Sequence, residues 1–401
     1  MNPILIVEDK YNGHHQAHLL LLCEALMARK QNVVLLATEE IKNTLLFPTL
    51  LQFAPNLTIR YLKGNSFGEN GKPTQKDFQE INSVIHELCP VHVYLITLDN
   101  WISVLIQSYL LKGGRAFAAP WSSIYLGPTI DYTRYGGIQA KTESSIRSRL
   151  RDMGRMLALF LLSHDSNLRC LHLFDEYAVD YLTKTMKRDK FDLIADPVEA
   201  AFYETDYDQE ELKKRFGISQ NDYLFITFGF HNRKKGTAAL IAAFRKLREQ
   251  PGFEATRLLI AGQLADPRIH AELENPATRR LIESGALIIE NRILSIDESV
   301  DCLKAADCVC IPYEGFYGTS GVLIKSYVLG KQVVCSEENW MGLFAKNVWG
   351  ELCSPENVDS IRQAMSNAFM SKPNKLFDRR EEFHSSRFQQ GLLNDLEDVA
   401  A

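Results

Sequence analysis

A glycine-rich loop between a short apolar run and a helical pattern is the clearest chemical feature of this chain. Residues 308–312 (C-V-C-I-P) read as a buried strand, a loop with three glycines follows, and the helical pattern then runs to Gly330. We expect the backbone N–H groups at the start of this helix to favour an anion, because partial positive charge gathers at a helix N-terminus. These residues are Thr319, Ser320, Gly321 and Val322. Alone, the pattern predicts a phosphate or carboxylate site.

A basic turn follows a second buried stretch. Residues 222–230 read as a strand, and the turn 231–237 (H-N-R-K-K-G-T) carries Arg233 and Lys235 before an amphipathic helix. Cationic side chains at the carboxyl end of a strand suit a diphosphate, because they carry full charge and donate several hydrogen bonds. The alternative interpretation is a solvated basic turn.

These segments and the strand at 257–262 (R-L-L-I-A-G) follow one another in an order that resembles a known family. The chain is similar to the C-terminal half of retaining, nucleotide-sugar-dependent glycosyltransferases of the GT-B fold (glycosyl transferases group 1). The resemblance covers roughly residues 190–370. It implies a UDP- or GDP-linked sugar donor, no metal and no further cofactor. It also implies that Lys235 binds the donor diphosphate, with Arg233 replacing an arginine that relatives carry nearer the strand.

The glycine loop departs from the family pattern. Relatives carry two glutamates separated by seven residues, and the second accepts hydrogen bonds from the nucleotide ribose. The corresponding residues here are Tyr317 and Lys325, and a lysine ammonium only donates hydrogen bonds. We expect Lys325 to lie at the donor sugar or ribose, where it would bind phosphate or pair with Glu314. Glu314 itself would reach the donor sugar as a catalytic residue.

The nucleobase in relatives lies against the turn after a strand that corresponds to residues 287–291. The resemblance therefore implies base contacts from the residues of that turn, whose types do not identify the base. They are Arg292, Ile293 and Leu294.

The first strand of the chain, residues 4–7, leads into a loop that opens a helix. In this loop Gly13 would allow close approach of the sugar, and His14 is either a catalytic contact or a polar helix start. Asp99 follows the strand at 91–97, where relatives often carry a histidine that contacts the donor sugar. A carboxylate there would bind or deprotonate an acceptor hydroxyl, or it would cap the helix that follows.

Strands alternate with helices along the chain, which indicates βαβ units and parallel sheets covered on both faces. We expect two Rossmann-like, doubly wound α/β domains with a cleft between them. Residues 1–195 would form the acceptor-side domain and residues 196–375 the nucleotide-sugar-binding domain. Residues 376–401 would form a helix that crosses back to the first domain.

The composition of the chain excludes several classes of protein. The 401 residues are 46% hydrophobic and carry a net charge of −5, which argues against a nucleic-acid binder. The eight cysteines form no pair of metal-type pairs, so we expect reduced core cysteines in a cytoplasmic protein. We expect neither a signal peptide nor a membrane span. The tripeptide at 206–208 (D-Y-D) reads as a helix start and not as a metal motif.

Residues 143–163 combine arginines with apolar residues at helical spacing. Such a helix can lie on an anionic bilayer, which would place the protein peripherally at the inner membrane face. The arginines do not share one face, however, so a surface helix with its apolar side in the core is the favoured interpretation.

The sequence thus predicts a glycosyltransferase that moves a sugar from a nucleotide diphosphate sugar to a hydroxyl of a glycan, a lipid-linked carbohydrate or a small molecule. The resemblance implies a retaining, metal-independent reaction. Two alternatives remain open: a non-catalytic binding subunit, favoured by the missing glutamates, and a nucleotide-sugar epimerase on the same fold.

Overall fold

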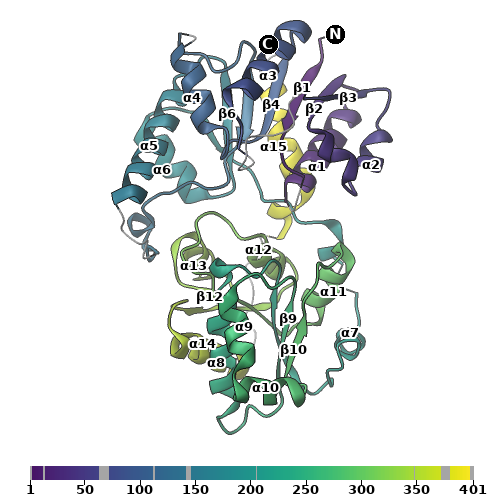
Figure 1. The fold of residues 1–401 in the computed structure, drawn as a ribbon, viewed down its shortest axis with the longest axis vertical. Coiled ribbons are helices and arrows are strands. Elements are labelled where there is room, and N and C mark those ends of the chain that lie inside the picture. The colour runs from purple at the N-terminus through teal and green to yellow at the C-terminus, as the bar shows by residue number, and fades with distance from the viewer. Residues whose placement is uncertain are drawn as a thin grey trace. The chain divides into compact units, whose positions relative to one another are not determined.

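The computed structural model describes residues 2–11, 14–62, 72–111, 113–140, 146–204, 206–346, 348–371 and 380–397. The described residues fall into two compact α/β units (Figure 1). The first unit comprises Met1–Ile130, Glu143–Pro197 and Ser385–Ala401, and the second comprises Asp131–Thr142 and Val198–His384.

Within the described residues, the first unit contains a parallel sheet of seven strands in the order β3-β2-β1-β4-β5-β6-β7. The strands are β1 (Ile4–Glu8), β2 (Val33–Ala37), β3 (Leu57–Tyr61), β4 (His92–Thr97), β5 (Trp121–Ile124), β6 (Leu168–Leu173) and β7 (Phe191–Leu193). The helices are α1 (His14–Ala28), α2 (Phe47–Leu51), α3 (Gln75–Leu88), α4 (Ile102–Leu111), α5 (Ile146–Ser163), α6 (Glu176–Met186) and α15 (Ser385–Glu397).

In the described part of the second unit, six parallel strands follow the order β10-β9-β8-β11-β12-β13. They are β8 (Tyr223–Phe228), β9 (Thr256–Ala261), β10 (Leu287–Glu290), β11 (Cys308–Ile311), β12 (Gln332–Ser336) and β13 (Gly350–Cys353). The helices are α7 (Gln209–Arg215), α8 (Thr237–Arg248), α9 (Pro267–Glu274), α10 (Pro276–Glu283), α11 (Ile296–Ala305), α12 (Gly321–Val328), α13 (Asn339–Lys346) and α14 (Val358–Met370).

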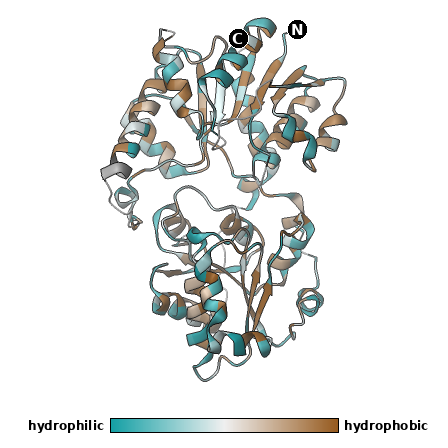
Figure 2. Ribbon diagram, in the orientation of Figure 1, coloured by the Kyte–Doolittle hydropathy of each residue, from teal (hydrophilic) through white to brown (hydrophobic). Residues whose placement is uncertain are grey.

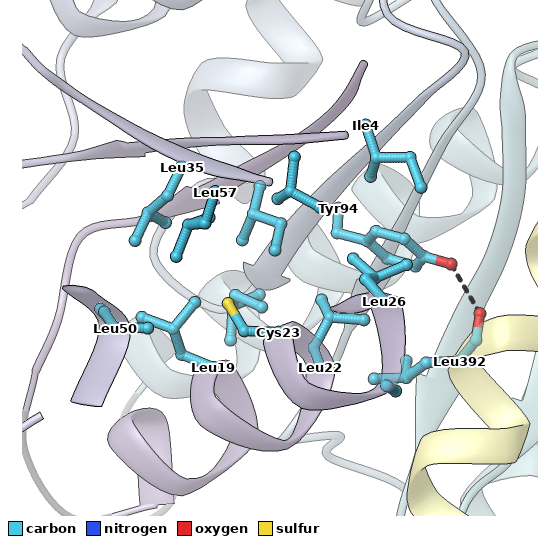
Figure 3. Packing of buried hydrophobic residues seen from close by; sticks show 14 of the residues in the cluster. Ile4, Leu19, Leu22, Cys23, Leu26, Leu35, Leu50, Leu57, Tyr94 and Leu392 are labelled. Carbon is cyan, nitrogen blue, oxygen red and sulfur yellow. Dashed lines mark hydrogen bonds between the residues drawn. The ribbon is translucent and has the colours of Figure 1, made fainter. Parts of the chain in front are cut away.

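Hydrophobic residues, coloured brown in Figure 2, are frequent in the strands of both sheets. In the first unit, Leu19, Leu22 and Leu26 of α1 pack on the sheet (Figure 3). The hydroxyl of Tyr94 on β4 donates a hydrogen bond of 2.6 Å to the carbonyl of Leu392 on α15. The C-terminal helix therefore belongs to the first unit, both by packing and by hydrogen bonding.

The predicted pair of Rossmann-like α/β units is confirmed, and the main difference lies in chain connectivity. Residues 131–140, which the sequence analysis placed in the first domain, pack in the second unit. Asn339 fixes this segment, because its Oδ1 accepts a hydrogen bond from the amide of Ala140 (3.0 Å) and its own amide donates to Ile138 O (2.7 Å). A sequence gives no sign of such a long-range bridge.

Two smaller expectations concern helices. Asp208 caps α7 by accepting hydrogen bonds from the amides of Glu210 and Glu211, as expected of a helix start. No helix among the described residues is long and apolar enough to cross a membrane.

Candidate active site

The basic turn lies at the carboxyl end of β8 in the second unit. Arg233–Lys235 form one turn of 3-10 helix, and Asn232 caps it by accepting a hydrogen bond from the Lys234 amide (3.0 Å). Gly236 then takes a positive φ of 65°, and α8 begins at Thr237. The cap and the glycine together hold the three basic residues at the edge of the sheet.

The loop after β11 packs directly on this turn, because β11 is the neighbour of β8 in the sheet. The ammonium of Lys235 donates a hydrogen bond to the Tyr313 hydroxyl and lies 3.9 Å from the centroid of that ring. The Glu314 amide donates to the carbonyl of Lys234 (2.8 Å). A Cβ on Gly236 would lie 2.0 Å from the carbonyl oxygen of Pro312, so only glycine fits there. The predicted phosphate turn and the predicted sugar loop therefore form one structure.

Arg268, at the start of α9, connects both segments. Its guanidinium lies 3.3 Å from both carboxylate oxygens of Glu314 and donates to the carbonyl of Arg233 (2.9 Å). Asp266 also pairs with Arg268, at 2.8 Å. Glu314 is thus held beside Arg233 by the guanidinium of Arg268.

Helix α12 starts on the same loop. Ser320 is its N-cap, and its hydroxyl accepts a hydrogen bond from the Leu323 amide (3.4 Å). The amides of Gly321 and Val322 belong to the first helical turn, where an α-helix offers no internal acceptor. The structure therefore places Thr319, Ser320, Gly321 and Val322 at a helix N-terminus, as the sequence predicts.

Lys325 has a different partner from the one expected. Its ammonium pairs with Glu199 at 2.9 Å and lies 4.9 Å from the ring centroid of Phe202, whereas Glu314 pairs with Arg268. The expected alternative of a Lys325–Glu314 pair is therefore wrong. The second carboxylate oxygen of Glu199 is buried and has no hydrogen-bond partner among the described residues.

The residues predicted to contact the nucleobase follow β10, which is the edge strand of the second sheet. Arg292 pairs with Glu298 (2.8 Å) and with Glu290 (3.3 Å), and the side chain of Ile293 is 81% exposed. Leu294 is half-buried. The three residues lie at the carboxyl end of their strand, and their contact with a base stays a prediction.

In the first unit, the side chain of Asp99 binds the backbone of the segment that follows β5. Its two carboxylate oxygens accept hydrogen bonds from the amides of Leu126 and Gly127, both at 2.9 Å, after β5. Burial raises the pKa of Asp99, while these two amides oppose that shift. Asp99 therefore positions the chain after β5, and its contact with an acceptor hydroxyl stays a prediction.

A pair of buried carboxylates lies where β1 ends. Glu8 accepts hydrogen bonds from the amides of Asp9 (2.8 Å) and Lys10 (2.9 Å), and its other oxygen lies 3.5 Å from Nδ1 of His15. Trp101 Nε1 donates to one oxygen of Asp9 (3.3 Å), and the other oxygen is buried without a partner among the described residues.

Burial sets the protonation of this pair. Burial raises the pKa of Glu8 to about 8, against the opposing effect of the Lys10 and Asp9 amides. Burial and then the Glu8 charge raise the pKa of Asp9 to about 6. Gly13, predicted beside these residues, and the side chain of His14 lie outside the described residues.

Replacing Glu8 by glutamine is expected to flatten the pH dependence of stability. The ordinary pKa of 4.5 rises to about 8 on folding, so the unfolded chain loses this proton first and the folded protein loses stability as the pH rises from 4.5 to 8. Glutamine cannot ionise. Urea unfolding at pH 5 and pH 8 measures the free energy of unfolding. Between pH 5 and pH 8, the stability of E8Q relative to wild type should increase by on the order of 2–4 kcal/mol. The exposed control E87Q should show the same pH dependence as wild type. Parallel curves for E8Q and wild type would contradict the buried state of Glu8.

Four residues of these sites escaped the sequence analysis: Tyr313, Arg268, Glu199 and Glu8. Tyr313 and Glu8 lie at the carboxyl ends of their strands, so position gave a signal for them. Arg268 and Glu199 come from segments far along the chain, and nothing in their local sequence points to the site.

The two units have the fold of the GT-B glycosyltransferases. Residues 222–370 match the family described as Glycosyl transferases group 1, so the second unit carries a domain of that family. No curated protein matches the chain in sequence.

Solved structures match nearly the whole chain. Alr3699/HepE from Anabaena, in complex with UDP, shares 14% identity at a TM-score of 0.67, covering 99% of this chain and 100% of its own. A glycosyltransferase from Rickettsia africae shares 13% at 0.68, covering 99% and 98%. Sucrose-phosphate synthase from Thermosynechococcus elongatus shares 16% at 0.63, covering 100% and 96%. At such identities these structures show a shared fold.

Proposed function

We propose that this protein transfers a sugar from a UDP-linked donor to a hydroxyl acceptor, with retention at the anomeric carbon and without a metal ion at the donor site. The observation that carries the proposal is the hydrogen bond from Lys235 to Tyr313, on the loop that leads to the start of α12. These residues lie in the segment that matches Glycosyl transferases group 1. UDP as the base-bearing part of the donor is supported by the UDP complex of Alr3699/HepE, which has the same fold.

The chemistry follows from charge. When the bond between the anomeric carbon and the diphosphate oxygen breaks, negative charge builds on the diphosphate and positive charge on the sugar. Lys235, the exposed Arg233 and the first-turn amides of α12 would stabilise the leaving diphosphate, because fixed cations and dipoles stabilise charge as it develops. Glu314, held by Arg268, would accept hydrogen bonds from donor-sugar hydroxyls.

We assign ribose recognition to the Lys325–Glu199 pair. Lys325 fixes one carboxylate oxygen of Glu199 at 2.9 Å, and the other oxygen is buried without a partner among the described residues. This carboxylate would replace the ribose-binding glutamate that the resemblance implies at position 325. The proposal explains how a donor-only lysine can stand where relatives need an acceptor.

Replacing Glu199 by glutamine should therefore weaken UDP binding by about tenfold, as expected when a hydrogen bond to a charged acceptor is lost. Isothermal titration with UDP and with 2′-deoxy-UDP and 3′-deoxy-UDP tests the assignment. Wild type should discriminate against at least one deoxy analogue, and E199Q should lose that discrimination. The control E204Q changes an exposed glutamate of the same segment and should bind like wild type. Equal discrimination by E199Q and wild type would remove Glu199 from the ribose site.

Helix α5 has a buried apolar side, as the favoured interpretation of the sequence expects, but it also carries exposed apolar residues that support contact with a membrane. Ala158, Leu159 and Leu162 face the core, whereas a second apolar stripe is exposed. That stripe consists of Leu150 (61% exposed), Met153 (68%), Leu157 (60%) and Phe160 (42%). The helix carries four arginines against one aspartate in a chain of net charge −5. We propose that this stripe lies on an anionic bilayer.

Vesicle sedimentation tests the membrane contact. Wild type should sediment with phosphatidylglycerol vesicles and much less with phosphatidylcholine vesicles. The double variant M153Q/L157Q should lower the partition coefficient at least about tenfold, because two exposed apolar side chains no longer enter the interface. M370Q changes an equally exposed methionine of the second unit and should behave like wild type. Unchanged sedimentation of the double variant would refute the contact.

Product analysis tests the function itself. The full chain would be incubated with UDP-glucose, UDP-galactose and GDP-mannose, each with and without octyl glycosides as acceptors. The expected result is nucleotide release together with an octyl disaccharide of retained anomeric configuration. Isomerised nucleotide sugar without acceptor would indicate the epimerase, and nucleotide binding without any product would indicate the binding subunit.

A further inference from the structure

Three side chains with metal-binding atoms converge on the far strands of the first sheet. Cys170 and His172 are two residues apart on β6, so they point to the same face. Asp192 on β7 is the direct register partner of His172 and shares that face. One sulfur, one ring nitrogen and one carboxylate oxygen of these residues lie within 4.8 Å of one another.

The spacing agrees with tetrahedral zinc. Zinc binds cysteine sulfur at about 2.3 Å and histidine nitrogen at about 2.0–2.1 Å, which separates the two ligand atoms by about 3.6 Å in a tetrahedral site. Sγ of Cys170 and Nδ1 of His172 are 3.7 Å apart. Both atoms therefore already stand at the distance that a shared ion requires.

Asp395 on α15 orients the histidine. It lies 2.8 Å from Nε2 of His172, in a fully buried contact. In the neutral tautomer that donates Nε2–H to Asp395, the lone pair of Nδ1 is directed toward Cys170. A carboxylate on the outer nitrogen of a metal-binding histidine is a recurrent partner, because it fixes the ring and raises its basicity.

Neighbouring buried polar atoms lack partners, which independently points to an occupant. Both ring nitrogens of His92 on β4 and the hydroxyl of Ser122 on β5 are buried without a hydrogen bond among the described residues. Ser122 is the register partner of Cys170. Tyr94 is the register partner of Ser122, and His92 precedes it by two residues on β4, so His92 points to the same face of the sheet. Orphaned buried groups of this kind call for a bound ion or water.

We propose that Cys170, His172 and Asp192 bind one zinc ion, with the fourth position open to water. The exposed Asp192 gives the ion a path from solvent. The site would tie β6 to β7 and, through Asp395, to α15. All its residues lie in the first unit, and none of them is among the residues assigned above to sugar transfer.

Metal content and a cobalt spectrum test the proposal on the full chain. After expression with zinc and dialysis, wild type should retain about one zinc per chain. Exchange with cobalt should give a thiolate-to-cobalt charge-transfer band, which only a cysteine ligand produces. C170S should abolish the band and D192N should weaken zinc binding at least about tenfold. Asp192 is exposed, so D192N should fold normally.

Matched controls are available for both variants. C89S changes an exposed cysteine, and D189N removes the same charge three residues before Asp192. Both should keep the metal and the band. One cobalt ion per chain without a charge-transfer band would show that the metal binds elsewhere, and it would overturn the proposal. The same holds if D192N and C170S each retain as much metal as wild type. Metal-free wild type whose melting temperature does not rise on adding zinc would overturn it as well.

Discussion

Replacing Lys235 by alanine is expected to lower kcat by about 10²- to 10³-fold, the usual loss when one fixed donor to a developing charge is removed. The ammonium of Lys235 is positioned by Tyr313, through a hydrogen bond and a ring contact of 3.9 Å. It therefore needs little rearrangement when the diphosphate departs. Initial rates of UDP release from UDP-glucose with an octyl glycoside measure the effect.

The neighbouring Lys234 provides the control. Its side chain is exposed on the same turn, and its backbone carbonyl accepts the hydrogen bond from the Glu314 amide. K234A should keep the rate within a few-fold of wild type. If K235A also retained a near-normal rate while wild type was active, the charge on the leaving diphosphate would have to be met by other groups.

Replacing Gly236 by alanine is expected to lower the free energy of unfolding by about 3–5 kcal/mol, or to prevent folding of the second unit. Two costs add. A residue with a side chain loses about 1–2 kcal/mol in the left-handed conformation that Gly236 adopts at φ 65°. The new Cβ would also lie 2.0 Å from the Pro312 carbonyl oxygen, so the basic turn and the loop after β11 would have to separate.

Comparison with Gly217 separates the steric cost at Gly236 from the cost of the left-handed backbone conformation. It has a φ of 69° and nothing within 4 Å of its Cβ position, so G217A pays only for backbone conformation. Urea unfolding should show a loss of about 1–2 kcal/mol for G217A and a clearly larger one for G236A. Equal losses would show that the turn does not need its close approach to Pro312.

The parts of this structure that the sequence predicts are those set by local pattern. Buried strands alternate with amphipathic helices, so two parallel α/β units follow from periodicity alone. The positions of Lys235 in the turn after β8 and of Ser320 at the start of α12 were predictable, because each lies next to a glycine that precedes or begins a helix. Such positions are fixed by neighbours in the sequence.

Pairings between distant segments were not predictable. Lys325 pairs with Glu199, 126 residues away, and Arg268 with Glu314, 46 residues away. The sequence contains many carboxylates that could pair with Lys325 or Arg268. The order of the strands in the folded sheet decides which of them comes close enough. Asp99 illustrates the same limit, since its bonds to Leu126 and Gly127 depend on β5 lying beside β4.

The exposed apolar residues of helix α5 could not be predicted, for another reason. Its sequence holds two apolar stripes, one with Leu159 and Leu162 and one with Met153 and Leu157. Periodicity shows that a helix can bury a face, but it does not say which of two candidate faces the rest of the unit covers.

Nucleotide binding to the second unit is the central claim, and calorimetric titration of the full chain with UDP and with uridine tests it most directly. The account predicts that UDP binds at least about tenfold more tightly than uridine, and that K235A loses most of this difference while K234A keeps it. Equal affinity for UDP and uridine in the wild type, or no binding of UDP, GDP or ADP at millimolar concentration, would contradict a diphosphate site formed by Lys235 and the start of α12.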